Sequence, residues 1–247
     1  MKLPANPFTR AIAAGEKQVG LWISLCSNFA AEVVSTAGFD WALIDMEHSA
    51  NDYFSVLGQL QAFAASPTTA LVRVEWNDAV AVKRLLDLGA PGLLFPMIQS
   101  VEEAKQAVAA TRYPPRGVRG VSGATRATAF GRITDYVAQV EEETAVLLQL
   151  ETREAVEQAE AIGAVDGVNG IQVMGWGTEV NQCLRMSRPE HLMDELLARH
   201  GPHPMFEASQ PEPAANNEEV YSYRIPSSYD LPALEALRDR LVAGAGR

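Results

Sequence analysis

The feature that most constrains the fold of this chain is an alternation of short, continuous apolar runs with longer amphipathic stretches. Continuous apolar runs are typical of strands that are covered on both faces, as in parallel sheets. Six clear runs and two weaker ones are expected strands, at residues 19–24, 41–46, 70–74, 92–97, 145–151 and 170–174, and then at 204–208 and 220–225.

Helix-like segments separate most of these runs. They cover residues 30–37, 53–64, 79–88, 101–110, 153–162, 189–200 and 231–243. About eight β/α units is the content of one TIM (β/α)8 barrel, so we expect residues 1–247 to form a single α/β domain of this class. A doubly wound sheet is the alternative, but residues 25–28 (LCSN) stand where a Gly-rich phosphate loop belongs.

The net charge of the chain limits the classes of partner that it is expected to bind. The formal net charge is −11, which repels phosphate backbones and makes nucleic acid an unexpected partner. No run approaches the length of a membrane helix, and the first residues do not read as a signal peptide. Cys26 and Cys183 form neither a close pair nor a zinc spacing, so we expect a cytoplasmic protein.

A long irregular segment at residues 112–133 interrupts the pattern. Loops of this length in a compact domain are usually lids, binding loops or subunit contacts, although a plain surface excursion is the alternative. The functional interpretation is favoured because arginines gather there in an acidic protein, at positions Arg112, Arg116, Arg119, Arg126 and Arg132.

Polar residues at strand ends are the candidates for chemistry, because active sites of TIM barrels lie where strands end. His48 follows the second expected strand and has Asp45 and Glu47 beside it. An imidazole held by a carboxylate can move protons near neutral pH. The alternative is an ordinary surface or core histidine.

Arg73 lies inside an apolar run, and a buried guanidinium needs a partner. It either forms a salt bridge to a core carboxylate or binds an anionic substrate or developing oxyanion. Gln149 and Glu151 alternate along the fifth run, so both face the barrel interior. Glu151 either bridges to Arg73 or helps to hold Mg²⁺ or Mn²⁺.

Other catalytic arrangements are poorly supported. Residues 120–123 (GVSG) do not match the G-x-S-x-G nucleophile elbow of serine hydrolases. Cys26 ends a strand without an adjacent base, and no lysine ends an expected strand, which argues against an imine-forming aldolase.

These residues, with their neighbours, resemble the HpcH/HpaI family of class II pyruvate-dependent aldolases. The resemblance covers about the first 170 residues and rests on several motifs in order, which together are far more specific than any one of them. The motifs are residues 37–48 (AGFDWALIDMEH), 71–74 (LVRV), 88–92 (LGAPG), 113–120 (YPPRGVRG) and 149–152 (QLET).

The resemblance implies a homohexameric TIM barrel that uses a divalent metal (Mg²⁺, Mn²⁺ or Co²⁺), of a kind found in aromatic catabolism. Its members cleave 4-hydroxy-2-oxo acids to pyruvate, or hydroxypyruvate, and an aldehyde. By resemblance His48 is the base and Asp87 holds and polarises it, Arg73 binds the keto oxygen and stabilises the enolate, Gln149 positions the pyruvoyl group, and Glu151 ligates the metal. The role of Asp87 rests on the resemblance alone.

The chain departs from the family after the sixth expected strand. The family has a Gly-Pro-x-Asp-Leu stretch there, whose Asp is the second carboxylate ligand, and without a gap this position falls on Gly177. Glu179 is the nearby carboxylate that we assign as the second metal ligand. Gly175 and Trp176 lie in the loop whose backbone is expected to meet the substrate carboxylate.

Two other hypotheses follow. The first is an impaired barrel of the same family that keeps the oligomer but lacks a competent metal site, because one carboxylate is missing and affinity follows ligand charge. The second is a lyase like the citrate lyase β subunit, which cleaves an acyl-CoA and requires a nucleotide-binding surface. The arginines of residues 112–133 are the basic candidate for that surface.

Overall fold

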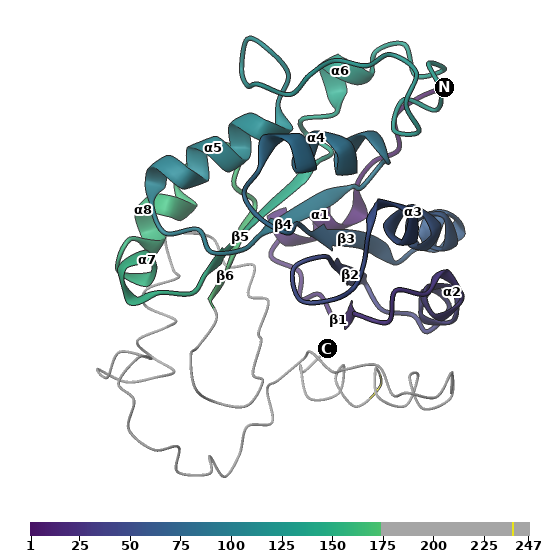
Figure 1. The fold of residues 1–247 in the computed structure, drawn as a ribbon, viewed down its shortest axis with the longest axis horizontal. Helices are drawn as coiled ribbons and strands as arrows, with labels where there is room; N and C mark the ends of the chain where they lie inside the picture. The colour runs from purple at the N-terminus through teal and green to yellow at the C-terminus, as the bar shows by residue number, and fades with distance from the viewer. Residues whose placement is uncertain (174–238, 240–247) are drawn as a thin grey trace.

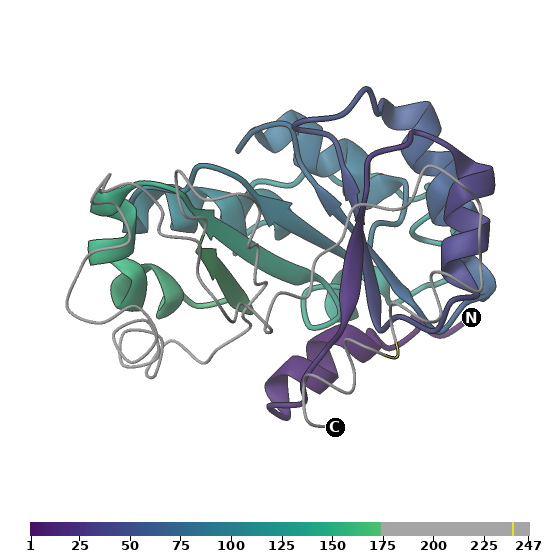
Figure 2. The ribbon, with the colours of Figure 1, turned by 90° about the horizontal axis from the view of Figure 1, so that it is seen from below.

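A computed structural model describes residues 1–173 and residue 239 of the chain. The described part contains a six-stranded parallel sheet in the order β1-β2-β3-β4-β5-β6, curled into part of a barrel (Figures 1 and 2). The strands are β1 (Gly20–Ile23), β2 (Trp41–Asp45), β3 (Thr69–Arg73), β4 (Gly92–Phe95), β5 (Ala145–Leu150) and β6 (Gly170–Val173).

All six clear apolar runs are therefore strands, with ends that differ from the expected ones by at most two residues. The parallel α/β class is confirmed. The expected strands at 204–208 and 220–225 lie outside the described residues, so the six described strands form part of a barrel and its closure stays a prediction.

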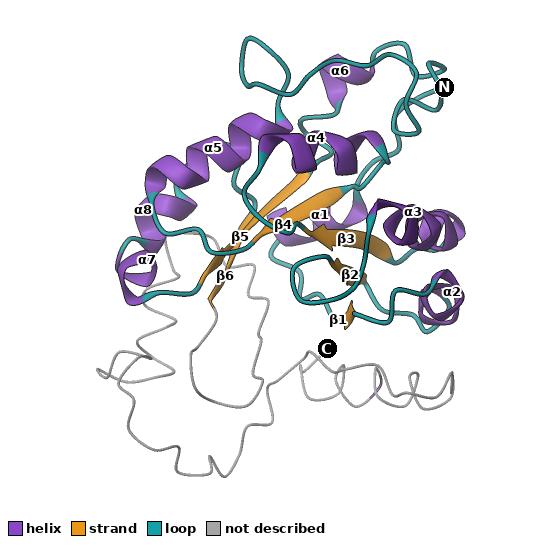
Figure 3. Cartoon of the chain, in the orientation of Figure 1, coloured by secondary structure: helices purple, strands orange, loops and turns teal. Residues whose placement is uncertain are grey.

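The first helix precedes β1 and packs on the inner face of the curled sheet, and the other helices connect the strands on its outside (Figure 3). They are α1 (Pro7–Ala13), α2 (Asn28–Ser35), α3 (Tyr53–Ala62) with the 3₁₀ turn η1 (Phe63–Ala65), α4 (Ala79–Asp87), α5 (Val101–Thr111), α6 (Tyr136–Gln139), α7 (Arg153–Glu157) and α8 (Ala159–Gly163). The helix expected at 153–162 is two short helices, and α1 and α6 were not expected. The expected helix at 189–200 lies outside the described residues, as does that at 231–243 apart from residue 239.

Side-chain caps define where these helices begin. Ser27, Asp52, Asp78, Ser100 and Thr152 each accept a hydrogen bond from a backbone N–H in the first turn of the helix that follows. Such caps pair amide groups that have no partner within the helix. They fix the point at which each loop from the carboxyl-terminal strand edge ends.

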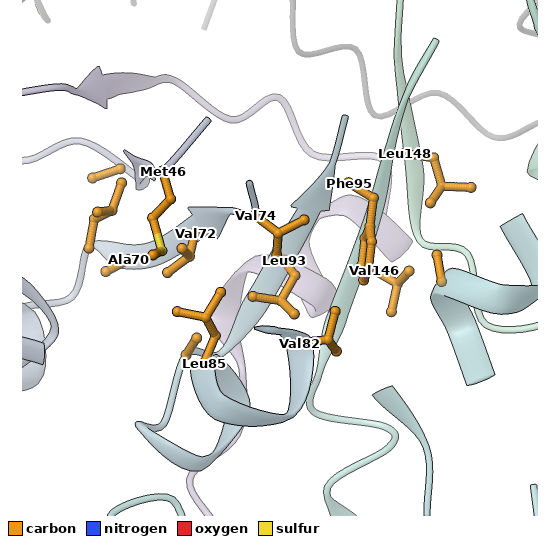
Figure 4. Packing of buried hydrophobic residues seen from close by; sticks show 14 of the residues in the cluster. Met46, Ala70, Val72, Val74, Val82, Leu85, Leu93, Phe95, Val146 and Leu148 are labelled. Carbon is orange, nitrogen blue, oxygen red and sulfur yellow. The ribbon is translucent and has the colours of Figure 1, made fainter. Parts of the chain in front are cut away.

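Two apolar layers lie on opposite faces of the sheet. On the outer face, Val72 and Leu93 pack in one cluster with Val82 and Leu85 of α4 (Figure 4). On the inner face, Phe8 and Ile12 of α1 pack under the residues Trp22, Trp41, Leu43, Leu71, Leu94, Ala145 and Leu147. Helix α1 covers the amino-terminal part of the interior, whereas the inward-facing charged residues Asp45 and Arg73 are the last residues of β2 and β3. Within the described part, no helix has the length and apolar character needed to cross a bilayer.

Candidate active site

The centre of the site is an ion pair between the last residues of β2 and β3. Asp45 and Arg73 lie opposite each other in the register of these strands. Arg73 Nε and Nη2 donate to Asp45 Oδ1 and Oδ2, each at 2.8 Å. Both side chains are only 4% exposed. The salt bridge that the sequence offered as one interpretation of Arg73 is thus present, and it fixes the plane of the guanidinium.

Two further groups hold the same guanidinium. Arg73 Nη1 lies 2.7 Å from Glu47 Oε2, and the ring of Trp22 stacks on Arg73 with 4.3 Å between the ring centre and Cζ. Arg73 is therefore paired on its edges and covered on one face. A cation fixed in this way keeps its position when charge develops nearby, as electrostatic catalysis requires.

The two carboxylates on Arg73 have opposite pKa shifts. Burial alone would raise the pKa of Asp45, but the hydrogen bonds and charge of Arg73 and two backbone N–H groups outweigh it and lower this pKa. Burial raises the pKa of Glu47, and the charges of Glu151 and Asp45 add to this effect while Arg73 and His48 oppose it. Groups with separated pKa values are typical of sites that move protons.

The turn after β2 places His48. Asp45 Oδ1 accepts the backbone N–H groups of Glu47 at 3.0 Å and His48 at 3.3 Å, and the Asp45 carbonyl accepts hydrogen bonds from Ser49 and Asn51. The His48 side chain is 71% exposed, and its Nε2 lies 3.6 Å from Glu47 Oε1. The carboxylate beside the imidazole is therefore Glu47, whereas Asp45 shapes the turn.

Glu151 directly follows β5. Its Oε2 accepts the backbone N–H of Met97 at 2.9 Å, and Met97 has a positive φ of 53°, which is uncommon for a residue with a side chain. The carboxylates that contact Arg73 among the described residues are Asp45 and Glu47, so the alternative bridge from Glu151 to Arg73 is replaced by Glu47. The charge of Glu151 also contributes to the raised pKa of Glu47.

Three interior side chains carry polar atoms that have no hydrogen-bond partner among the described residues. Gln149 and Gln172 lie opposite each other on β5 and β6, both are fully buried, and neither their amide oxygens nor their amide nitrogens are paired. The indole nitrogen of Trp22 is also unpaired. Because buried polar groups are normally hydrogen-bonded, this part of the interior is suited to a polar ligand.

Asp87 is placed differently from the other candidates. It is the last residue of α4, which returns from the end of β3 to the amino-terminal strand edge, whereas His48 follows the carboxyl-terminal end of β2. Asp87 Oδ1 accepts a hydrogen bond from Arg119 Nη2 at 2.9 Å. The contact between Asp87 and His48 that the resemblance implies is thus not made within one chain.

The site contains groups that the sequence analysis did not select. Trp22 and Gln172 were overlooked, although both occupy inward positions in the two-residue alternation of their strands. Glu47 was noted only as a neighbour of His48, because sequence alone does not show which way a turn residue points. Gly175, Trp176 and Glu179 lie outside the described residues.

The carboxylates suit a hard cation. Glu151 and Glu47 offer oxygen ligands, which Mg²⁺ and Mn²⁺ prefer, and these ions commonly take their remaining ligands from water and substrate. Within residues 1–173 and at residue 239, no group of three or more His, Cys, Asp or Glu side chains forms a larger ligand set. The unpaired amide atoms of Gln149 lie on the adjoining strand surface and fit the oxygens of such a substrate.

The arginines of residues 112–133 are attached to the body of the protein. Arg112 and Arg116 each form ion pairs with Glu141 and Asp166, at 2.7 to 3.1 Å. Arg126 donates to the carbonyl groups of residues 88 and 60. These guanidinium groups act in the structure as links between segments, which does not favour the nucleotide-binding interpretation of this loop.

The site and the curled parallel sheet define a class: an α/β protein with buried arginine, carboxylates and a histidine at the carboxyl-terminal strand edge. Residues 18–176 match the profile of the family described as HpcH/HpaI aldolase/citrate lyase. The chain therefore belongs to the HpcH/HpaI aldolase/citrate lyase family.

Individual proteins agree with this assignment. A pyruvate aldolase of Rhizobium etli is 54% identical over 171 residues, 69% of this chain and 67% of that protein. A 4-hydroxy-2-oxo-heptane-1,7-dioate aldolase of Klebsiella pneumoniae is 52% identical over 167 residues, 67% of this chain and 63% of that protein. The match thus spans about two thirds of the length of these relatives.

A solved structure agrees as well. The crystal structure of an HpcH/HpaI aldolase/citrate lyase family protein from Burkholderia cenocepacia superposes with a TM-score of 0.67 and 32% identity, covering 98% of this chain and 81% of that one.

Proposed function

We propose that this protein is a divalent-metal-dependent class II aldolase that reversibly cleaves 4-hydroxy-2-oxo acids to pyruvate, or hydroxypyruvate, and an aldehyde. The observation that carries the proposal is the fixed guanidinium of Arg73, held by Asp45 and Glu47 at the strand edge at which Glu151 follows β5. The names of the relatives support aldol cleavage.

Each residue then has a defined task. Arg73 binds the keto oxygen of the substrate and stabilises the negative charge that develops there as the carbon–carbon bond breaks. Gln149 orients the oxo acid through its unpaired amide. His48 accepts the proton of the 4-hydroxyl group and returns a proton to the enolate carbon. We assign Gly175 and Trp176, from their place in the sequence, to the substrate carboxylate.

Glu151, with Glu47 beside it and Glu179 as the assigned second carboxylate, would hold Mg²⁺, Mn²⁺ or Co²⁺. The bound ion would supply Lewis acidity toward the oxo acid. The alternative electron sink, an imine with a lysine, finds no candidate, because the lysines of the chain are Lys2, Lys17, Lys83 and Lys105 and none of them lies on a strand.

The position of Asp87 bears on assembly. Asp87 and His48 lie at opposite strand edges of one chain, so their pairing requires the Asp87 of a second copy. We therefore propose a homo-oligomer, a hexamer by resemblance, of single barrel domains over residues 1–247 that works in the cytoplasm. Light scattering after size exclusion tests this, and a clean monomer would contradict it.

The test of the function is pyruvate release from a 4-hydroxy-2-oxo acid with and without added Mn²⁺. Release that depends on the metal supports the proposal, and its absence at high enzyme concentration refutes it. Calorimetric titration with Mn²⁺ separates the impaired-barrel alternative, which predicts no saturable binding. For that case, Gly177→Asp should restore activity if the missing carboxylate is the fault. A thioester-cleavage assay tests the acyl-CoA alternative.

A further inference from the structure

Arg119 is a buried cation within residues 112–133. Its side chain is fully buried, and its carboxylate partner among the described residues is Asp87, at 2.9 Å. Its Nε and Nη1 atoms have no hydrogen-bond partner there. A buried charge is costly unless it is paired, so this single contact between Arg119 and Asp87 requires an explanation.

Aromatic rings enclose the guanidinium. Arg119 Cζ lies 4.6 Å from the ring centre of Tyr113 and 5.8 Å from that of Tyr136, and the Tyr136 hydroxyl is 3.5 Å from Nη2. Tyr113 and Tyr136 also belong to a small apolar cluster with Ile133 and Val140. The faces of aromatic rings stabilise a desolvated cation, so the enclosure fixes Arg119 without neutralising it.

Asp87 is the less buried partner. Its side chain is 23% exposed, against none for Arg119, and its Oδ1 is the atom that Arg119 binds. The titratable groups that face Arg119 are Asp87 from α4, Tyr113 from the segment after α5, and Tyr136 from α6. A rigid, buried donor thus holds one oxygen of a carboxylate that reaches the surface.

We propose that Arg119 is a positioning residue: enclosed by Tyr113 and Tyr136, it fixes Asp87 so that its carboxylate can bind His48 of a second copy of this chain. The inference deepens the proposed function and rests on it for the role of Asp87. Residues 112–133 then serve to position a carboxylate, and they act neither as a mobile lid nor as a nucleotide-binding loop. A planar guanidinium suits this task better than an ammonium group, because its donors have a fixed geometry.

The experiment reads the protonation of His48 directly. The full chain is treated with diethyl pyrocarbonate, which modifies neutral imidazole, and the modified His48 peptide is quantified by mass spectrometry as a function of pH. The variants are Arg119→Met, Arg119→Lys and Asp87→Asn. The control is Arg112→Met, which removes an arginine of the same segment that pairs with Glu141 and Asp166 instead.

A carboxylate beside an imidazole favours its protonated form. We therefore expect the midpoint of His48 modification to lie about one pH unit lower in Asp87→Asn. Arg119→Met should give a shift in the same direction, Arg119→Lys a smaller one, and Arg112→Met none. Combining Arg119→Met with Asp87→Asn should add nothing, because both act through one carboxylate.

Activity gives the second readout. In Arg119→Met, kcat should fall about tenfold or more with little change in KM, because proton transfer is affected and substrate binding is not. The acidic limb of the kcat profile should move with the His48 midpoint. If Arg119→Met does not fold, Arg119→Lys carries the test, with melting and light scattering as folding controls.

The outcomes separate the two proposals. A parent chain without metal-dependent cleavage refutes the proposed function, while a His48 midpoint that still responds to Arg119 and Asp87 supports the inference. An active parent whose midpoint is the same in Arg119→Met, Arg119→Lys and Arg112→Met refutes the inference alone. An equal shift in Arg112→Met also refutes it, because the effect would then come from general loosening of the segment.

Discussion

Arg73 and Arg119 are buried to nearly the same extent, at 3% and 1% exposure, but they are paired differently. Arg73 contacts two carboxylates through three nitrogen atoms, whereas Arg119 contacts Asp87 through one. Each stacks on an aromatic ring. Among the described residues, the cation at the proposed catalytic edge has a second counter-ion and the cation at the opposite edge does not.

The sharpest way to test the role of Arg73 is Arg73→Lys. Lysine keeps the charge but loses the planar fork, so kcat/KM for retro-aldol cleavage should fall about 10²- to 10³-fold, the usual effect of removing one donor to a developing oxyanion. Pyruvate release measures it. Arg10→Lys, at an exposed pair with Glu143, is the control and should behave like the parent. Near-normal activity of Arg73→Lys would contradict the assigned role.

The next largest effect is expected for Asp87→Asn on stability. This change leaves Arg119 buried without a carboxylate, and breaking a buried pair in this way costs about 3 kcal/mol or more of unfolding free energy. Urea unfolding at one fixed protein concentration measures it, because association also contributes to stability. If Asp87→Asn is no more destabilising than Asp45→Asn, the difference in counter-ions between the two arginines has no energetic consequence.

Asp45→Asn should cost less, about 1–2 kcal/mol at pH 7, because Glu47 remains as a counter-ion for Arg73. The pKa of Asp45 is lowered in the folded state, so its contribution is present above its unfolded pKa and is lost as the pH falls through the lower folded value. The difference in stability between the parent and Asp45→Asn should therefore begin to shrink as the pH falls below about 4. Urea midpoints from pH 7 to pH 3 check this, and a constant difference would contradict it.

Glu47→Gln should have the smallest effect of the series. The pKa of Glu47 is raised in the folded state, so ionisation of Glu47 as the pH rises reduces stability. Removing this charge should accordingly leave unfolding at pH 7 unchanged or slightly more difficult. The affinity of Glu47→Gln for Mn²⁺ should be about tenfold lower than that of the parent, as is usual for groups that support a metal ligand. Glu151→Gln should lower this affinity more. Calorimetry at pH 7 measures both variants, and a larger loss of affinity in Glu47→Gln would make Glu47 rather than Glu151 the main ligand.

The strands were predictable because their signal is local. Continuous apolar runs identified β1 to β6, and Gly89 follows the end of α4 with a positive φ of 88°, the conformation that favours glycine after a helix. Helix α1 was missed although Asn6 and Pro7 are a typical start of a helix, because a seven-residue helix contains too little periodicity. The alternation of Gln149 and Glu151 correctly placed Gln149 in the interior.

The contacts of the site were less predictable, because they depend on distances between segments far apart in the sequence. The pairing of Arg73 with Asp45 joins residues 28 positions apart, and only the parallel register places them side by side. The pairing of Arg119 with Asp87 depends on the path of residues 112–133, which has no periodic signal. The residue types were enough to select the charged groups as candidates, but the path of the chain determines which of them form ion pairs.

Helix α1 restricts the route by which ligands reach and leave the site around Arg73. Phe8 and Ile12 seal the sheet from below, and Asn6 ties this helix to the carbonyl groups of Pro91 and Glu143. Among the described residues, the carboxyl-terminal strand edge is therefore the open side next to Arg73, and in the proposed reaction the substrate enters and the products leave there. In the proposed reaction, the fragment nearer that edge blocks the one held by Arg73, so we expect the aldehyde to leave first and the oxo acid second.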